Sequence, residues 1–507
     1  MKIIDLLKHS AVKYPNRPAV KDDTIELTYS QLLFNVSSLS DYLVSKGCRA
    51  GIKTALLLGN STLYFISFFA VSTAKATIVP GSAKMTVYEA VRFIEGSNIS
   101  IAITESTFAK KLAGELSQTV QITIITLDWD QNDHLKVQTF LSAKPKEDNQ
   151  NGDVVLMVYT SGTTGLSKVV MLTDDQLISN MFIYRSVMGF DGHNIVYCSL
   201  PLYHIYCICA QVLTHISLGD TFITTTQPFF IKDFLRAVQK HKVTITAFVP
   251  YIGTLMSEYP SPDEYDTSSL KYITLSGAKT PRLVYQKLTE TFSHIKFINT
   301  YGMSEAGSRI SIAAPEPQEF PIESVGKPIP GVRIRITDEE GSVLPDGCVG
   351  EVEVKSSGVF KGYFNQPQLT REAIVDGWLK TGDLGKLDKD GNLFLVGRKK
   401  QIIVCGGDNI YPTEVEECLL ENALVSEAVV VGMPDKRLEE VPCAFVVKKN
   451  GSRIDSADLI RYCQTRLSSF KVPRSIYFIE EIPKLGISKI NYRRLMKIVN
   501  DNLRVKP

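Results

Sequence analysis

The first three hundred residues alternate between short apolar runs and longer segments with helical spacing of apolar residues. Helices are predicted over 32–44, 64–74 and 87–96, and strands over 53–58, 76–80 and 99–104. Strands that alternate with helices at this spacing form βαβ units, so we expect a parallel sheet. The alternation resumes after residue 153, with buried strands predicted at 244–249 and 272–275. The polar segment 130–152 interrupts it and is predicted to be largely loop.

The pattern changes after Pro321. Short strands are predicted at 332–337, 349–355 and 393–396. The turn sequences between them favour antiparallel pairing. Beyond Gly397 the chain is long enough to bury a small core of its own. This last part is predicted to contain helices 414–422 and 457–467 and strands 425–431, 441–447 and 475–479.

A chain of 507 residues is too long for a single hydrophobic core, so more than one domain is expected. We place the boundary at the charged stretch that begins with Arg398. The predicted fold is α/β. An N-terminal domain over 1–397 combines parallel βα sheets with a small antiparallel, β-barrel-like part, and a small α+β domain spans 398–507.

The composition argues against several classes of protein. Apolar residues make up 44% of the chain and charged residues 22%, as in ordinary soluble domains. The net charge of +2 gives no general attraction for nucleic acid or an anionic membrane. The most apolar region, 63–79, contains Lys75 and falls short of a membrane span. The N-terminus resembles an amphipathic helix and lacks the apolar core of a signal peptide.

The nine cysteines are scattered along the chain. Only Cys207 and Cys209 are close together, and their spacing is not that of zinc ligands. We therefore expect buried thiols in a reducing cytoplasm, without disulfides or a metal site.

A loop rich in hydroxyl groups follows the apolar run 154–158. Its hydroxyl, glycine and basic residues are Thr160, Ser161, Gly162, Thr163, Thr164, Gly165 and Lys168. Glycine lets a backbone approach a polyanion, hydroxyls and amides donate hydrogen bonds to phosphate oxygens, and lysine supplies charge. The spacing is not that of a Walker P-loop. From the residues alone, a phosphate-binding loop and an ordinary turn both remain open.

This loop closely resembles the phosphate-binding signature of the acyl-adenylate-forming superfamily, which includes acyl-CoA synthetases, carrier-protein adenylation domains and firefly-type luciferases. That signature reads Thr-Ser-Gly-Thr-Thr-Gly-x-Pro-Lys-Gly. Here Ser167 replaces the proline and Val169 replaces the last glycine. The resemblance implies that the loop holds the β- and γ-phosphates of ATP, and that the C-terminal domain is mobile.

The sequence 299–305 places an aromatic ring, a hydroxyl and a carboxylate close together. A ring can stack on a purine and a carboxylate can hold Mg²⁺ beside phosphate oxygens, although a strand-end turn is the simpler interpretation. The sequence is similar to the family motif Tyr-Gly-x-Thr-Glu. The resemblance implies that Asn299 meets the adenine amino group, Tyr301 stacks on adenine, Ser304 contacts the α-phosphate and Glu305 contacts the magnesium ion.

Three further residues would complete the nucleotide site. Asp383 ends a Thr-Gly-Asp motif in which the aspartate accepts hydrogen bonds from both ribose hydroxyls, a role suited to a pure acceptor. The resemblance implies that Arg398 binds ribose or phosphate. Lys489 aligns with the lysine that bridges the substrate carboxylate and the α-phosphate. A cation there would stabilise charge developing on the phosphate. The alternative for Lys489 is one more surface lysine in a basic tail.

The C-terminal part also matches motifs that handle the thiol. The resemblance places Lys400 at the hinge and makes the Gly406-Gly407 turn part of the tunnel for a pantetheine arm. Phe470 falls where some ligases stack the CoA adenine. The sequence around the turn is closer to acyl-CoA ligases than to peptide-synthetase adenylation domains.

Two weaker matches point to an acyl pocket. His204 ends a Pro-Leu-Tyr-His segment, and the resemblance implies that it gates the pocket. By itself, a histidine near apolar residues is more often a core residue. Gly277 and Ala278 belong to a loop similar to one that flanks the adenine and acyl sites, and Tyr251 is a further lining candidate. Departures from the family pattern occur at Ser167, Val169, Asp174, Lys279 and Ser488.

Five motifs in the family's order favour an ATP-dependent, magnesium-requiring carboxylate ligase. It would form an acyl-AMP and then a thioester with CoA. A second hypothesis replaces CoA by the phosphopantetheine of an acyl carrier protein. A third, supported by the departures, is a nucleotide-binding protein that has lost catalysis. The candidate pocket permits aryl, hydroxy or medium-length aliphatic acids, and a luciferase-like reaction has no support in the sequence.

Overall fold

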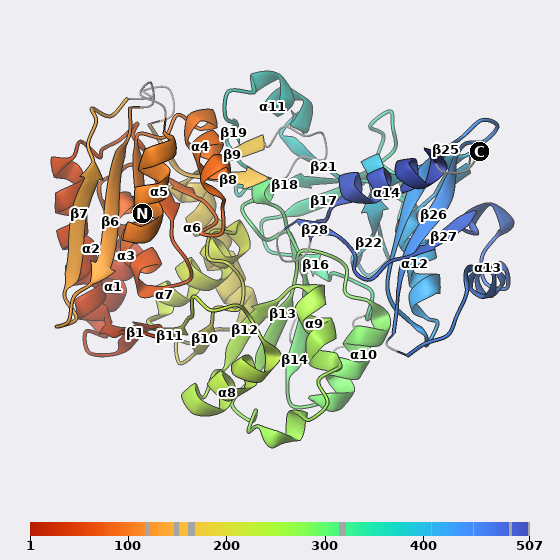
Figure 1. The fold of residues 1–507 in the computed structure, drawn as a ribbon, viewed down its shortest axis with the longest axis horizontal. Helices are drawn as coiled ribbons and strands as arrows, with labels where there is room; N and C mark the ends of the chain where they lie inside the picture. Colours follow the sequence, from red (N-terminus) through yellow and green to blue (C-terminus); the bar gives the residue numbers. More distant parts are fainter. Residues whose placement is uncertain are drawn as a thin grey trace.

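The computed structural model describes residues 1–116, 121–146, 152–160, 168–313, 321–406, 408–449, 451–485 and 489–504. Two large sheets, a smaller antiparallel sheet and a C-terminal unit make up the fold (Figure 1). In this part of the chain, no helix combines the length and the apolar character needed to cross a membrane.

The first large sheet runs in the order β19-β9-β8-β4-β3-β5-β6-β7, and its strands from β8 to β6 are parallel. Its strands are β3 (Lys53–Leu57), β4 (Thr77–Pro80), β5 (Ile101–Thr104), β6 (Thr123–Trp129), β7 (Leu135–Leu141), β8 (Val154–Thr160), β9 (Lys168–Thr173) and β19 (Gly362–Tyr363). The helices before and between them are α2 (Tyr29–Ser45), α3 (Thr62–Thr73), α4 (Val87–Gly96) and α5 (Ser106–Glu115). The predicted alternation over residues 32–104 is confirmed.

The loop predicted over 130–152 is wrong for Leu135–Leu141, which form β7. This strand pairs antiparallel with β6 at the edge of the sheet. Leu135 and Val137 pack against the core, whereas the residues between and after them are mostly exposed. An edge strand with one solvent-facing side needs few apolar residues. The alternation of half-buried and exposed residues in this strand is weak, and the polar residues around it made a loop the simpler prediction.

The second large sheet runs in the order β16-β15-β14-β13-β12-β10-β11-β1-β2, and its strands from β14 to β1 are parallel. Its strands are β1 (Pro18–Lys21), β2 (Glu26–Thr28), β10 (Ile195–Tyr197), β11 (Thr221–Ile223), β12 (Ile245–Phe248), β13 (Tyr272–Leu275), β14 (Lys296–Tyr301), β15 (Ser311–Ile312) and β16 (Lys327–Pro328). The associated helices are α1 (Ile3–Lys13), α6 (Asp174–Met188), the π-helix η2 (Cys207–Leu213), α7 (Thr214–Leu218), α8 (Ile231–His241), α9 (Pro250–Ser257) and α10 (Arg282–Thr291). The strands predicted at 244–249 and 272–275 are confirmed as β12 and β13.

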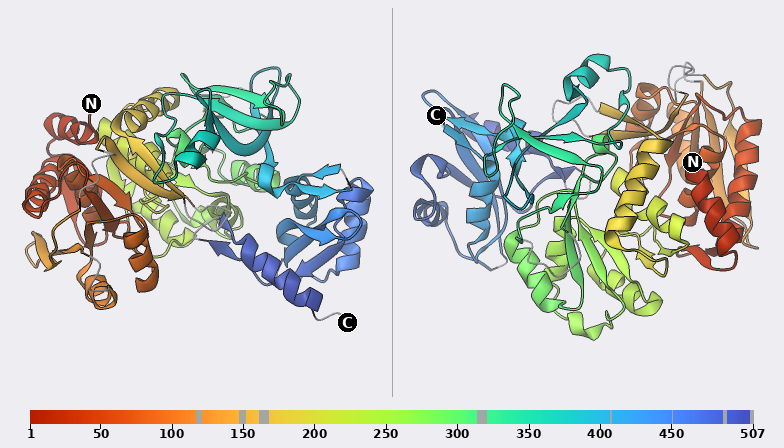
Figure 2. Two further views of the ribbon diagram at one scale, coloured as in Figure 1. Left: turned by 90° about the horizontal axis from the view of Figure 1, so that it is seen from above. Right: turned by 180° about the vertical axis from the view of Figure 1, so that it is seen from behind.

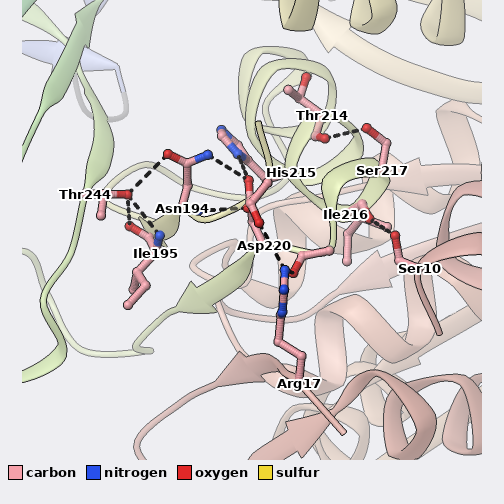
Figure 3. A network of polar contacts seen from close by, with 12 residues as sticks. Ser10, Arg17, Asn194, Ile195, Thr214, His215, Ile216, Ser217, Asp220 and Thr244 are labelled. Carbon is pink, nitrogen blue, oxygen red and sulfur yellow. Dashed lines mark hydrogen bonds and ion pairs between the residues drawn. The ribbon is translucent and has the colours of Figure 1, made fainter. Parts of the chain in front are cut away.

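A buried polar network ties the N-terminal segment to this sheet (Figure 3). Asp220 accepts hydrogen bonds from the backbone and side chain of Asn194, at 2.8 and 3.1 Å, and contacts Nδ1 of His215 at 2.6 Å. Arg17 donates to the carbonyl of Gly219 at 2.9 Å. The side chains of His215 and Asp220 are 1% and 0% exposed, so this histidine–aspartate pair has no access to a substrate. It satisfies buried polar groups instead.

The antiparallel sheet runs in the order β17-β18-β21-β20, with β22 beside β21. Its strands are β17 (Arg333–Thr337), β18 (Gly350–Lys355), β20 (Ile374–Val375), β21 (Trp378–Leu387) and β22 (Leu393–Arg398). The three strands predicted in this region and their antiparallel pairing are confirmed. The short helix α11 (Pro367–Ala373) lies beside it.

The C-terminal unit contains its own sheet and core. Its elements are β23 (Ile403–Cys405), β24 (Asp408–Ile410), α12 (Pro412–Leu420), β25 (Val425–Asp435), β26 (Glu439–Lys448), α13 (Ser456–Gln464), β27 (Ser475–Phe478), β28 (Lys484–Leu485), β29 (Lys489–Ile490) and α14 (Tyr492–Arg504). Its buried apolar residues form a cluster separate from that of the large sheets. Figure 2 shows the unit set to one side, with the β28–β29 hairpin reaching back toward the large sheets. The predicted boundary between 397 and 398 stays a prediction.

Candidate functional site

The motifs around Tyr301 and Asp383 meet where the second large sheet approaches the antiparallel sheet. Tyr301 is the last residue of β14, and Asp383 lies in β21. The Tyr301 hydroxyl donates a hydrogen bond to Oδ2 of Asp383 at 2.7 Å. Nε of Arg398 forms an ion pair with Oδ1 at 2.9 Å, from the facing position on β22. Three residues that the sequence placed in separate motifs thus form one cluster.

The environment of Asp383 suits an acceptor of hydrogen bonds. Burial raises the pKa of its carboxyl, and the Arg398 charge and the Tyr301 hydrogen bond partly offset this rise. Burial also raises the pKa of Tyr301 far above its usual range, so the phenol is a neutral donor. Each carboxylate oxygen has one protein partner and keeps a further acceptor position. Two neighbouring hydroxyl groups can therefore bind Asp383 without displacing either protein contact.

Glu305 and Lys168 contact the same residue, Tyr363. Glu305 lies in a short 3₁₀ helix, η4 (Ser304–Ala306), and is buried, while Ser304 is half-buried. The Tyr363 hydroxyl donates to Oε1 of Glu305 at 2.9 Å. Nζ of Lys168 lies 4.5 Å from the centre of the Tyr363 ring. The carboxylate expected at a magnesium ion and the lysine expected at phosphate therefore face one tyrosine.

The sequence analysis missed Tyr363. It belongs to β19, a two-residue strand that pairs antiparallel with β9. So short a strand has no apolar periodicity to detect. Burial and, next, the Glu305 charge raise the pKa of its phenol above the usual range. Tyr363 therefore stays protonated and donates to Glu305.

The loop predicted to bind phosphate lies in the sequence between β8 and β9. Thr160 ends β8, Lys168 begins β9, and the two face each other in the antiparallel pair. The Thr160 hydroxyl donates to the Lys168 carbonyl at 3.4 Å. The expected phosphate contacts of Ser161, Gly162, Thr163, Thr164 and Gly165 fall outside the described residues, as does the departure at Ser167.

Asn299 lies two residues before Tyr301 on β14, in the strand that leads into the cluster. Its Nδ2 donates to the carbonyl of Ile322 at 3.1 Å. An asparagine amide has two hydrogens and an acceptor oxygen, so further bonding capacity remains. The contact of Asn299 with adenine stays a prediction.

The candidate acyl-pocket residues flank the ends of the parallel strands. Gly277 follows β13 with a φ of +91°, a conformation that favours glycine, and lies beside Val249, the residue before α9. Tyr251 is on α9 and is 40% exposed. His204 and Ala278 are exposed too, and the His204 ring centre lies 4.5 Å from that of Tyr203. Their roles at an acyl group stay predictions.

Two departures from the family pattern have structural partners here. Lys279 forms an ion pair with Glu417 on α12 of the C-terminal unit. Asp174 begins α6 and is 5% exposed. Its Oδ1 accepts from the backbone N–H of Ile3 at 2.9 Å, and its Oδ2 contacts Nζ of Lys2 at 3.0 Å. Asp174 therefore fixes the start of the chain against α6.

The hairpin that carries Lys489 docks against the candidate acyl pocket. Lys489 begins β29, which pairs antiparallel with β28. Nζ of Lys484, on β28, lies 4.2 Å from the centre of the Tyr251 ring and 2.7 Å from Glu427 of its own unit. The side chain of Lys489 and all of Ser488 lie outside the described residues. The role of Lys489 stays a prediction.

The remaining C-terminal candidates are dispersed. Lys400 is exposed in a short 3₁₀ helix just after β22. Gly406 forms the turn between β23 and β24 with a φ of +60°, and Gly407 lies outside the described residues. Phe470 is half-buried against the C-terminal core. Their roles as hinge and thiol tunnel stay predictions.

All nine cysteines lie in the described part of the chain as free thiols, and all except Cys348 are buried. Burial raises the pKa of Cys198 and Cys209 to about 12, so these thiols are inert as nucleophiles at neutral pH.

Comparisons with known proteins agree with this geometry. The sequence model described as AMP-binding enzyme matches residues 7–364, and the one described as AMP-binding enzyme C-terminal domain matches residues 414–489. A long-chain-fatty-acid–CoA ligase of Bacillus subtilis (strain 168) is 31% identical over 99% of this chain and 95% of its own. A 4-coumarate–CoA ligase of Petroselinum crispum is 32% identical over 91% of this chain and 87% of its own.

Solved structures share the fold. The o-succinylbenzoate CoA synthetase of Bacillus subtilis, in complex with its acyl-adenylate intermediate, has a TM-score of 0.83 and 27% identity over 97% of both chains. ATP-bound MatB from Rhodopseudomonas palustris has a TM-score of 0.88 and 24% identity over 99% of both chains. The predicted fold class, with parallel sheets, an antiparallel part and a C-terminal α+β unit, is confirmed.

Proposed function

The chain belongs to the AMP-binding enzyme family, and we propose that it is an AMP-forming ligase that joins a carboxylic acid to the thiol of CoA. The similar proteins named as CoA ligases support this assignment. The observation that carries it is the contact of Asp383 with both Tyr301 and Arg398. These contacts bring together the residues predicted to bind adenine, ribose and phosphate, which are Tyr301, Asp383 and Arg398. A nucleotide-binding site requires such a grouping.

In the first half-reaction, an oxygen of the substrate carboxylate attacks the α-phosphorus of ATP. The bond from this phosphorus to the bridging oxygen breaks, and pyrophosphate leaves with the electron pair. Asp383 accepts hydrogen bonds from the ribose, and Lys168 holds the leaving phosphates. Lys489 brings positive charge to the α-phosphate, where charge increases in the transition state. Because the site holds the carboxylate and ATP in position, little translational and rotational entropy remains to be lost in reaching the transition state.

The donor groups fit a magnesium ion that is bound jointly by protein and nucleotide. The described residues contain no cluster of three or more His, Cys, Asp or Glu able to hold a metal by itself. Mg²⁺ is usually bound through one or two carboxylates together with phosphate oxygens. Tyr363 occupies Oε1 of Glu305, and no described residue bonds Oε2. When bound there, Mg²⁺ would neutralise phosphate charge.

In the second half-reaction, the CoA thiol loses its proton and its sulfur bonds to the acyl carbon. The bond from this carbon to the phosphate oxygen breaks, and AMP leaves with the electron pair. For this step the C-terminal unit turns about Lys400, which withdraws Lys489 and presents Gly406 and Phe470 to the pantetheine arm. Such a rearrangement separates the two chemistries that share one site. The acceptor we favour is free CoA, because the sequence after Gly406 is closer to acyl-CoA ligases than to adenylation domains.

The test is a panel of carboxylic acids assayed with ATP and Mg²⁺ for pyrophosphate release, followed by addition of CoA or a holo-carrier protein. We expect acid-dependent formation of AMP and pyrophosphate, and a CoA thioester detected by mass spectrometry. Formation of ADP would contradict the proposal. Turnover with the carrier protein alone would reassign the acceptor. ATP binding with no pyrophosphate release across the panel would favour a protein that has lost catalysis.

A further inference from the structure

Arg309 carries a buried positive charge that no carboxylate among the described residues balances. The residue is 1% exposed, and none of its three guanidinium nitrogens finds a hydrogen-bond acceptor among the described residues. It also forms no ion pair with a described carboxylate. Burying an unpaired cation is strongly unfavourable, and almost all buried polar groups in folded proteins are satisfied. So isolated a guanidinium calls for an anionic ligand.

Several other buried polar atoms on neighbouring segments lack a hydrogen-bond partner in the described part of the chain. They are Oδ1 of Asn180, both amide atoms of Gln211 and Oγ of Ser308. Asn180 lies on α6 and donates through Nδ2 to the Arg309 carbonyl at 3.0 Å. Gln211 lies on the π-helix η2, which packs against α6. We refer to Asn180, Gln211, Ser308 and Arg309 as the Arg309 cluster.

Two aromatic rings hold the guanidinium in place. Its central carbon lies 3.9 Å from the ring centre of Tyr206 and 4.9 Å from that of Tyr184. Such stacking favours a cation, and the Tyr184 hydroxyl also interacts with the Arg309 charge. No carboxylate faces the guanidinium among the described residues, so its planar fork remains available to bind a carboxylate through two parallel hydrogen bonds.

The Arg309 cluster adjoins the reaction site. The backbone N–H of Ser308 donates to the Met303 carbonyl at 3.1 Å, and that of Ile310 donates to the Tyr301 carbonyl at 2.9 Å. A Cβ at Gly302 would stand 1.6 Å from the Ser308 carbonyl oxygen. The segment that bears Arg309 is thus folded directly onto the Tyr301–Gly302 backbone.

The opposite side of the Arg309 cluster leads to the candidate acyl pocket. Tyr206 comes two residues after His204, and its hydroxyl is hydrogen-bonded to Thr274 of β13, the strand that ends just before the Gly277 loop. Tyr206 also directly precedes the π-helix η2, and π-helical segments are frequent at functional sites. Arg309 therefore lies between the segment that carries Tyr301 and the residues expected to line the acyl group.

We propose that the acid activated by this enzyme carries a second carboxylate at its far end, and that Arg309 binds this carboxylate. This inference rests on the function proposed above and narrows its substrate class to dicarboxylic acids. One carboxylate is adenylated while the other pairs with the guanidinium, and Gln211 and Ser308 supply additional hydrogen bonds. Because Arg309 is almost fully buried, side chains around it have to move as the substrate enters.

The test compares each dicarboxylic acid with its methyl half-ester and with the monocarboxylic acid of equal chain length, in aliphatic and aryl series. A buried charge-assisted pair predicts a kcat/KM for the diacid about 10- to 100-fold above that for the half-ester. In Arg309→Met the ratio of kcat/KM for the diacid to kcat/KM for the half-ester falls toward one, and Arg309→Lys retains part of the preference. Arg236→Met, at an exposed arginine on α8, serves as the matched control and keeps the preference.

The possible failures are distinguishable. Equal turnover of diacids and half-esters, or a preference unchanged in Arg309→Met, overturns the inference but leaves the ligase assignment intact. Absence of pyrophosphate release with every acid overturns the ligase assignment. A binding readout without catalysis then decides the inference: a diacid should raise the melting temperature of the wild type more than that of Arg309→Met. Equal shifts would reject the inference, and melting without ligand shows whether each variant is folded.

Discussion

The Tyr301 hydroxyl donates a hydrogen bond to Asp383, a residue 82 positions later in the chain, at 2.7 Å. The bond joins the end of a parallel strand to the middle of an antiparallel one. It orients the only carboxylate that the sequence motifs assign to ribose. A tyrosine expected to stack on adenine thus has a second role, which is to fix its neighbour.

Tyr301→Phe should weaken nucleotide binding more than it slows chemistry. The substitution keeps the ring but removes a donor from a buried carboxylate, a loss of about 1–3 kcal/mol. We expect KM for ATP to rise about 10-fold or more, with kcat less affected, in a pyrophosphate-release assay. Tyr285→Phe is the matched control, because it removes a 2.8 Å hydrogen bond from α10 to the Phe297 carbonyl near the start of β14, away from Asp383. Equal effects of the two substitutions would count against a specific role.

The pKa of Asp383 links pH to ATP binding and to stability in opposite directions. Burial raises this pKa, so the folded protein binds the proton more tightly than the unfolded chain. The contribution to stability is present at low pH and is lost as pH rises through the folded pKa. Ribose binding requires the ionised form, so KM for ATP should rise as pH falls through the same pKa.

Asp383→Asn provides the comparison for this pH effect. Its KM for ATP should be high and lack the acid-side dependence of the wild type. The melting temperature of the wild type minus that of the variant should decrease as pH is raised through the pKa of Asp383. A difference that is constant with pH would mean that Asp383 keeps an ordinary pKa.

Lys489→Ala should slow acyl-AMP formation strongly while leaving thioester formation from supplied acyl-AMP largely intact. Loss of one group that stabilises transition-state charge lowers kcat by about 10²- to 10³-fold. ATP–pyrophosphate exchange measures the first half-reaction and CoA-dependent AMP release the second. Lys497→Ala, at an exposed position on α14, is the control. Undiminished exchange in Lys489→Ala would reject the assignment of this lysine.

The ion pair between Lys279 and Glu417 should favour the arrangement in which the C-terminal unit faces the acyl pocket. The two side chains are 26% and 43% exposed, so salt screens their interaction. Lys279→Ala or Glu417→Ala should slow acyl-AMP formation only about two- to threefold at low salt, and the difference should vanish at high salt. The double variant should be no slower than either single one. Additive effects would show that the two residues act separately.

Helix α4 illustrates what could be predicted from local sequence. Its limits agree with the predicted 87–96, and its start is fixed by a capping box formed by Thr86 and Glu89. The Thr86 hydroxyl accepts a hydrogen bond from the Glu89 backbone N–H, and the Glu89 carboxylate accepts one from the Thr86 backbone N–H. Strand β7 was missed because its pairing with β6, and not its composition, makes it a strand. Local patterns therefore locate elements with a capping signal or a strong apolar run, and they miss a mostly polar edge strand.

The residues of the candidate site also fall into those that the sequence could identify and those that only the structure reveals. Asp383 and Glu305 were found because they belong to short motifs with recognisable chemistry. Tyr363 and Arg309 were not, because their importance arises from contacts with Lys168, Glu305 and the two tyrosines that lie far away in sequence. A buried arginine cannot be told from an exposed one by its neighbours in the chain.

The strand pairing just before Lys400 determines how a turning C-terminal unit could act on the nucleotide. Arg398 is held by Asp383, and Lys399 forms an ion pair with Glu351 of β18 at 3.0 Å. Arg398 and Lys399 are therefore tied to the sheet that presents Asp383. In the proposed rotation about Lys400, the chain on the N-terminal side of this residue would stay fixed to that sheet. The proposed replacement of Lys489 by the thiol would then leave the ribose contacts of Asp383 undisturbed.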